Sequence, residues 1–461
     1  MSMHYTLKKS VILARIGLGV FALNSAPAIG TPVSFREQIA PILLQQCQSC
    51  HGPTEQKGGY RLDTFDFLSR KDDAGDPPLV PGQPEKSDLY SLLVTAEADE
   101  RMPKKAAPLP KETIDLVRRW IAEGAQFDGG DKTAALVEII PPRVHDKAPE
   151  VYSLPLPVTA LAFSPDGSEL VASGFRELTV WKPDEGKLLR RIANVAPRTF
   201  EIAYTPDGSA LAVASGSPGE FGEVRLYEPK TGAMLRQIIS AADAVLDVKI
   251  SADGRWLVTG GADHCLSIFD FATGERRHRL SVHSDAVTAV AISPDSTQVA
   301  SVALDRAAKV FDIKSGKLVS IYRDHQSPLY GIAFTPDGKQ VMTAGYDKSL
   351  HQWSIADAKK QRDLVLEGNI LRMQVLGDQI YFGGSGKKIS QASIVDLKAG
   401  RVLSAVGDWV YALAIHAPTH RLAVGGYDGK ITVWNMEDGK QVAQFSAAPG
   451  YTESVVATSV R

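Results

Sequence analysis

The sequence at residues 287–322 reads VTAVAISPDSTQVASVALDRAAKVFDIKSGKLVSIY. Small and apolar residues fill most of its first six positions, and a Pro-Asp turn follows at Pro294 and Asp295. Three more short apolar runs come next, at residues 299–302, 308–311 and 318–322. Runs of this length that are separated by turn residues are typical of β-strands joined by tight connections. The stretch therefore predicts a unit of four short strands.

The same unit recurs along residues 151–461. Seven turn positions are equivalent, namely Pro165, Pro206, Ala252, Pro294, Pro336, Gly377 and Ala417. Successive positions are 41, 46, 42, 42, 41 and 40 residues apart, and the one long interval contains a Gly/Ser/Pro-rich insert at 215–222. Four strands at this period are typical of a propeller blade. We therefore predict an all-β, seven-bladed propeller over 151–461, whose last blade is completed either by 151–154 or by the tail 454–460.

Three repeats end in a way that resembles WD repeats, with Val180-Trp181, Phe311-Asp312 and Val433-Trp434-Asn435. The full Gly-His to Trp-Asp signature is mostly absent. The resemblance implies that loop histidines pair with turn aspartates for structural reasons, in the pairs His283 with Asp305 and His325 with Asp347. These histidines are therefore not expected to bind a metal.

Three further polar side chains of the repeats have structural interpretations. Asp263 and Asp428 occupy the same turn without a histidine partner, where an aspartate accepts hydrogen bonds from backbone amides. Cys265 adjoins an apolar strand and is predicted to be a buried free thiol. The sequence contains no G-x-S-x-G, P-loop or HExxH motif.

A different chemistry is predicted by Cys47-Gln48-Ser49-Cys50-His51. The C-x-x-C-H pattern is typical of covalent haem attachment, because two thiols three positions apart can reach both vinyl groups of one porphyrin. His51 then lies under the iron as its proximal ligand. A thioredoxin-like redox pair would need an α/β pattern that is missing here, and a zinc site would need a second cysteine pair. The only other cysteine is Cys265, so we predict one covalent haem c held by Cys47 and Cys50.

The second axial ligand follows by elimination. Between the signal and residue 130, Met102 is the only methionine and His51 the only histidine. Met102 has charged neighbours, and Pro103 disfavours a helix at that position, which argues against a role as a core filler. We therefore predict Met102 as the distal ligand of the haem iron. A thioether ligand raises the reduction potential, as suits an electron carrier.

The segment around this motif, residues 33–130, is predicted to be a small all-α domain. A helix is expected at 111–123, ended by Gly124. The segment resembles the cytochrome c domain of planctomycetes and related bacteria, at Ile42-Leu43, His51-Gly52-Pro53, Gly59-Tyr60-Arg61-Leu62-Asp63, PGQPEKS (81–87), Met102-Pro103 and WIAEGA (120–125). The resemblance implies the same thioether cysteines and axial ligands. Such domains often have two prolines after the methionine, whereas in this chain Lys104 follows Pro103.

Length and charge frame these two regions. A chain of 461 residues is expected to form more than one domain. Residues 1–28 combine three basic residues, a short apolar run and a small-residue cleavage site, which predicts a secretory signal and a periplasmic or otherwise exported protein with no membrane span after cleavage. Several prolines at 131–150 predict a linker. A net charge of -2 disfavours nucleic acid as a partner.

These features favour an exported monohaem cytochrome that carries single electrons, with the propeller as a docking platform for a protein partner. An acidic redox partner is expected to dock at Arg101, Lys104 and Lys105, beside Met102. One alternative is an oxidoreductase whose propeller holds a second cofactor or substrate, and another is a non-redox interaction or carbohydrate-binding module. The fold does not choose between them. An electron-transfer protein is favoured over a stand-alone enzyme, with no catalytic residue assigned.

Overall fold

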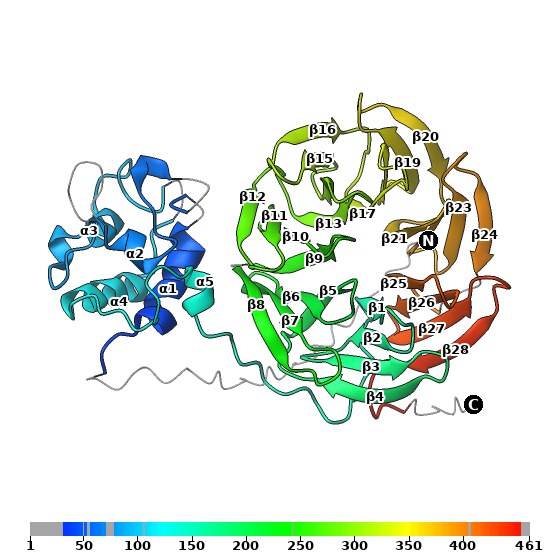
Figure 1. Ribbon diagram of the computed structural model, residues 1–461, viewed down its shortest axis with the longest axis horizontal. Helices are drawn as coiled ribbons and strands as arrows, with labels where there is room; N and C mark the ends of the chain where they lie inside the picture. The colour runs from blue at the N-terminus through cyan, green and yellow to red at the C-terminus, as the bar shows by residue number, and fades with distance from the viewer. Residues whose placement is uncertain are drawn as a thin grey trace, which may run out of the picture.

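The structure is a computed structural model that describes residues 31–452 except 49, 53–55, 71–77, 105–106, 242 and 404–406. It has a small helical part followed by a ring of β-sheets (Figure 1). The expected signal at 1–28 and the tail 454–460 lie outside the described residues. Within the described part of the chain, no helix is long and apolar enough to cross a membrane.

The helical part is built from short helical elements and the loops between them. In chain order the elements are η1 (Phe35–Ile39), α1 (Ala40–Ile42), η2 (Leu43–Cys47), η3 (Lys57–Gly59), α2 (Phe65–Leu68), η4 (Pro84–Lys86), α3 (Asp88–Val94), α4 (Lys111–Ala122) and α5 (Leu136–Ile139). Elements η1, α1 and η2 follow one another without a break, and the hydroxyl of Ser34 accepts the amide of Glu37 at their start. This cap satisfies one of the free amides at the helix N-terminus.

Helix α4 forms the centre of the helical core, where the sequence predicted a helix. Trp120 and Ile121 are fully buried on one face of α4, and the ring of Trp120 packs 5.3 Å from that of Phe35. Gly124 ends the helix with a φ of 97°, a conformation that favours glycine. The last helix, α5, packs in the same core through the buried Leu136.

The ring consists of seven four-stranded sheets, each formed by four consecutive strands. The blades are β1–β4 (Leu161–Phe163, Leu170–Ser173, Leu178–Lys182, Lys187–Ile192), β5–β8 (Arg198–Tyr204, Leu211–Ser217, Phe221–Tyr227, Met234–Ala241), β9–β12 (Val245–Ile250, Trp256–Gly261, Leu266–Asp270, Arg276–Leu280), β13–β16 (Val287–Ile292, Gln298–Ala303, Ala308–Asp312, Leu318–Tyr322), β17–β20 (Leu329–Phe334, Gln340–Gly345, Ser349–Ser354, Lys360–Val365), β21–β24 (Ile370–Leu376, Gln379–Gly384, Ile389–Ser393, Ala399–Leu403) and β25–β28 (Val410–His416, Arg421–Gly426, Lys430–Asn435, Gln441–Ser446). The predicted seven-bladed propeller is confirmed.

The blades are held together by apolar packing between neighbours. The first strand of each blade lies at the centre of the ring (Figure 1). A buried hydrophobic cluster fills each of the seven contacts between consecutive blades, including the contact between the last blade and the first. Burial of this apolar surface is the main stabilising contribution to the ring.

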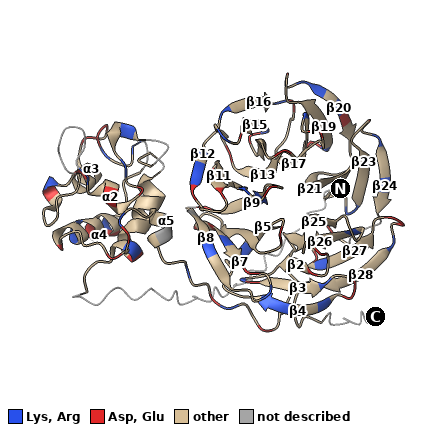
Figure 2. Cartoon of the chain, viewed as in Figure 1, with Lys and Arg blue, Asp and Glu red and all other residues tan. Residues whose placement is uncertain are grey.

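Among residues 31–452 that the structure describes, no strand is shared between the first and last blades. The described residues 151–154, one of the two predicted closing segments, form no strand. Instead, the amide of Tyr152 donates to the carbonyl of Pro449 at 3.1 Å, and the amide of Val158 donates to Gly426 at 3.1 Å. Basic and acidic residues are interspersed over the propeller (Figure 2), in keeping with the near-neutral total charge.

The Pro-Asp turns share one hydrogen-bond pattern. In the first blade, Asp166 accepts the hydroxyl of Ser164 and the amide of Ser168. The corresponding aspartates in the next four blades, Asp207, Asp253, Asp295 and Asp337, likewise accept the amide two residues later. Each turn thus satisfies its own backbone locally, which explains why the repeat is visible in the sequence.

Candidate functional site

The predicted attachment motif lies in one tight turn at the end of η2. The amides of Cys50 and His51 both donate to the carbonyl of Cys47 at 3.1 Å. Because the chain turns about this carbonyl, the two thiols and the imidazole belong to one compact segment. Cys47 and Cys50 are both partly buried, and neither forms a disulfide.

Burial controls the protonation of these groups. It raises the pKa of Cys47 to about 12, with a further contribution from Cys50, so this thiol is neutral at pH 7. Burial also lowers the pKa of His51, which keeps the imidazole neutral, the form that binds a metal. The Nδ1 atom of His51 is buried and has no hydrogen-bond partner among the described residues. The ring meets Tyr60 edge to face at 5.7 Å.

Met102 packs against the same hydrophobic core as Cys47 and Tyr60. Its amide donates to the carbonyl of Leu92 at 2.8 Å, which fixes the loop at the end of α3. The structure therefore brings the predicted distal ligand and the first attachment cysteine to one core, although 55 positions separate them.

The basic residues beside Met102 differ in their surroundings. Lys104 is exposed, whereas Arg101 is partly buried, and its Nε atom has no partner among the described residues. Lys105 lies outside the described residues. The burial of Arg101 was missed in the sequence, because a charged residue between Glu100 and Met102 carries no signal for burial.

The donor set fits a covalently attached haem. It comprises two cysteine side chains in one turn that form no disulfide, a neutral imidazole directly after them and a thioether on the same core. The buried Nδ1 of His51, which has no hydrogen-bond partner among the described residues, is an orphaned polar atom of the kind that marks a site for an additional group. Imidazole and thioether are both established ligands of haem iron.

The histidine pairs of the propeller form as predicted. In the fourth blade, Nδ1 of His283 donates to Asp305 at 2.9 Å, and Nε2 lies 2.9 Å from the hydroxyl of Ser301. His325 makes the same contacts with Asp347 and Thr343 in the fifth blade. Both ring nitrogens are thereby used in the fold.

The other turn residues also match their predicted roles. Asp263 accepts the amide of Cys265, and Asp428 accepts the amide of Lys430. Cys265 is 3% exposed and is a free thiol. Burial raises the pKa of this thiol, with the charge of Asp263 acting in the same direction.

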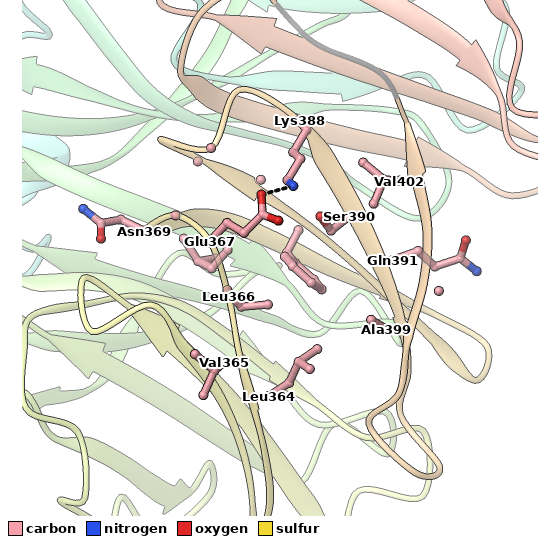
Figure 3. A pocket seen from close by; sticks show the side chains of 17 residues that line it. Leu364, Val365, Leu366, Glu367, Asn369, Lys388, Ser390, Gln391, Ala399 and Val402 are labelled. Atoms are coloured by element: carbon pink, nitrogen blue, oxygen red, sulfur yellow. Dashed lines mark hydrogen bonds and ion pairs between the residues drawn. The ribbon is translucent and has the colours of Figure 1, made fainter.

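The sixth blade lacks this polar arrangement and has a pocket instead (Figure 3). Counting from the ends of the corresponding strands, Leu366, Phe382 and Gly386 stand where the fifth blade has His325, Thr343 and Asp347. All three line a pocket of about 160 Å³ between β20 and the sixth blade. Lys388 and Glu367 form an ion pair at this pocket. The pocket thus follows from the replacement of a hydrogen-bonded triad by apolar and small residues.

Aromatic side chains of the fifth and seventh blades gather in what we call the aromatic cluster. Its members are Tyr330, Tyr346, Trp409, Tyr411 and Tyr427. The rings of Tyr330 and Tyr346 stack at 4.9 Å, and those of Tyr411 and Tyr427 lie 5.8 Å apart. Tyr427 is 54% exposed, Tyr346 38% and Trp409 37%. Sequence reasoning missed this cluster, because its members come from different blades.

Comparison with known families agrees with both parts of the structure. Residues 47–106 match the family "Planctomycete cytochrome C", a range that contains Cys47, Cys50, His51 and Met102. Residues 234–270, 274–312, 316–354 and 400–435 match the family "WD domain, G-beta repeat". No curated protein matches the chain. The chain therefore has a segment similar to the planctomycete cytochrome c family, followed by a seven-bladed propeller in which four segments match WD repeats.

Proposed function

We propose that the protein is an exported c-type cytochrome that carries single electrons and uses its propeller as a docking platform. The observation that carries this proposal is the turn of Cys47, Cys50 and His51, with Met102 packed on the same core. Haem c supplies a one-electron ferric/ferrous couple when bound. We also propose that the helical part adopts the all-α cytochrome c fold.

Each residue of the site has a defined role in this proposal. Cys47 and Cys50 would hold the porphyrin through thioether bonds, and His51 and Met102 would bind its iron. Because a thioether is a weak donor to ferric iron, Met102 favours the ferrous state.

Mass spectrometry of the denatured full-length protein tests the attachment. We expect the chain mass plus one haem after acid-acetone extraction, and incomplete attachment in Cys47→Ala. Cys265→Ala is the matched control, because it removes the remaining cysteine of the chain without touching the motif. Complete loss of haem from the wild-type protein on extraction would overturn the cytochrome proposal.

Export is proposed from the signal-like segment at 1–28. Cleavage after Ala28 gives a mature chain that starts at Ile29. N-terminal sequencing of the protein recovered from the periplasm tests this. An intact N-terminus at Met1 in a protein that carries haem would contradict the export proposal and leave the haem proposal standing.

The aromatic cluster supports the docking role of the propeller. Tyr and Trp side chains contribute strongly to protein–protein binding, because they bury much area at a small cost in entropy. In-cell cross-linking to the protein bound at the propeller tests the role with Trp409→Ala plus Tyr427→Ala, and with Leu318→Ala on the outer strand β16 as control. We expect the double variant to lose the cross-link and the control to keep it. Equal cross-link yields in the double variant and the control would overturn the docking role of the aromatic cluster.

A further inference from the structure

The connection between the two parts of the chain is short and stiff. Helix α5 packs in the helical core and ends at Ile139. The carbonyl of Arg143 already accepts a hydrogen bond from Arg225 of β7 at 2.7 Å. Only three residues lie between these points, and two of them are Pro141 and Pro142, whose backbones are restricted. The helical part is therefore tethered close to the propeller.

The segment after this connector is clamped to the second blade. Arg225 is fully buried and pairs with Glu223 at 2.8 Å. Nε2 of His145 donates to Glu223 at 2.7 Å, and its ring stacks on Phe221 at 5.7 Å. The amide of His145 also donates to Asn194 at 2.9 Å. We call these contacts the His145 clamp; they fix the chain three residues beyond the connector.

Element η2, which leads into the attachment motif, lines a pocket together with the propeller. One pocket is lined both by η2 residues of the helical part and by residues of the second and third blades. The helical residues are Leu44, Gln45 and Gln48, and the propeller residues include Ile239, Cys265, Arg276 and Arg279. In Figure 1 the helical part lies beside β8, which contacts α5. Gln48 directly follows Cys47, so the turn that holds the haem cysteines and the propeller line the same pocket.

One cation in this pocket differs from its neighbours on β12. Arg279 pairs with Asp263 at 3.0 Å, and the exposed Arg277 pairs with Glu275 at 3.0 Å. Arg276 is partly buried, and among the described residues no hydrogen bond or ion pair is found for its side chain, whereas its backbone pairs with Phe269 in the sheet. Burial and the charge of Arg279 lower the pKa of Arg276, and the carboxylates of Asp263 and, in the helical part, Asp63 act in the opposite direction. An arginine nevertheless stays charged at neutral pH.

We propose that the propeller holds the cytochrome domain in one orientation and that the charge of Arg276, whose side chain has no ion pair among the described residues, raises the reduction potential of the haem. This inference rests on the proposed haem attachment. Oxidation adds one positive charge to the iron, and a cation held nearby makes that step less favourable. Screening by salt is weak for a partly buried charge. Arg276 is thus a positioning residue, which acts on the redox reaction through its charge and does not bind the iron.

A redox titration of the full-length holoprotein tests the role of Arg276. We expect Arg276→Gln to lower the midpoint potential and Arg276→Lys to keep most of the wild-type value. Arg277→Gln is the matched control, because it removes a cation one residue away that is exposed and paired. Equal potentials in Arg276→Gln and wild type would overturn the inference. The titration requires bound haem. A protein without haem would refute the proposed function itself, whereas equal potentials in a haem-containing protein would refute only the role of Arg276.

A second variant tests the orientation. Pro141→Gly with His145→Ala loosens the connector and the His145 clamp without touching the haem domain core or Arg276. We expect a larger radius of gyration in solution scattering and a midpoint potential shifted toward that of Arg276→Gln. Unchanged scattering together with an unchanged potential would show that the clamp does not hold the domain.

Discussion

The imidazole of His325 donates from Nδ1 to the carboxylate of Asp347 at 2.5 Å and joins the loop that enters the fifth blade to the turn after its second strand. His325 is 3% exposed, so its ring nitrogens depend on protein partners. The sixth blade has Gly386 at the position of Asp347 and has a pocket there. The hydrogen-bonded triad of the fifth blade is thus replaced in the sixth blade by three residues that line a pocket.

Removal of Asp347 is expected to destabilise the propeller. Asp347→Ala leaves Nδ1 of a buried histidine unpaired, which costs about 1–3 kcal/mol in the free energy of unfolding. Gly386→Ala is the control, because an added Cβ there meets no atom closer than 3.9 Å. It should change stability by less than about 0.5 kcal/mol. Denaturant unfolding of both variants measures the difference in stability. Equal losses of stability would show that the hydrogen bond between His325 and Asp347 does not stabilise the propeller.

The propeller is expected to lose stability in acid through its Pro-Asp turns. Hydrogen bonds from Ser164 and Ser168 lower the pKa of Asp166 to about 2. In the unfolded chain the pKa is near 4, so these bonds contribute fully above pH 4 and the contribution is lost as the pH falls toward 2. Asp166→Asn should therefore lower the melting temperature at pH 7 and make little difference near pH 2. The same deficit at both pH values would contradict this.

Met102→Ala is expected to change the haem spectrum. The wild-type ferric protein should show the weak far-red band of sulfur-to-iron charge transfer, and the variant should lack it. Loss of the thioether should also lower the reduction potential. Met436→Leu in the propeller is the control and should keep both properties. Absence of the band from the wild-type protein would show that another group, or none, occupies the distal position.

Electron transfer to an acidic acceptor is expected to depend on Lys104. Charge near the haem steers encounter and raises the association rate more than the affinity, and salt screens this effect. Lys104→Glu with Lys105→Glu should slow the reaction at low salt and flatten its salt dependence in stopped-flow measurements. Lys111→Glu, an exposed lysine at the start of α4, is the control. Equal salt slopes in the double variant and wild type would exclude docking at these lysines.

Truncation of the chain is expected to show that the segment after the connector, residues 143–150, stabilises the propeller. A fragment that starts at 143 keeps His145 beside Glu223 and the carbonyl of Arg143 beside Arg225. A fragment that starts at 151 leaves these two buried charged groups with fewer partners, which is destabilising. The longer fragment should have the higher melting temperature. Equal melting temperatures would show that the segment contributes nothing to the propeller.

Much of the architecture could be predicted because its signals are local in the chain. A Pro-Asp turn such as that of Asp166 satisfies its own backbone within five residues, so each blade is visible in the sequence. Helix α4 was predicted from the spacing of its apolar face and from Gly124. The motif from Cys47 to His51 was readable for the same reason, since five consecutive residues carry it.

Contacts between distant segments were decided only by the tertiary structure. The sequence named Met102 by elimination, but its packing on the core of Cys47 depends on the helical fold. The position of Arg276 opposite the turn of Gln48 depends on the clamped connector and on two adjacent blades. Periodicity and turn chemistry act between near neighbours in the chain, whereas burial and pairing across a ring arise only when all seven blades close.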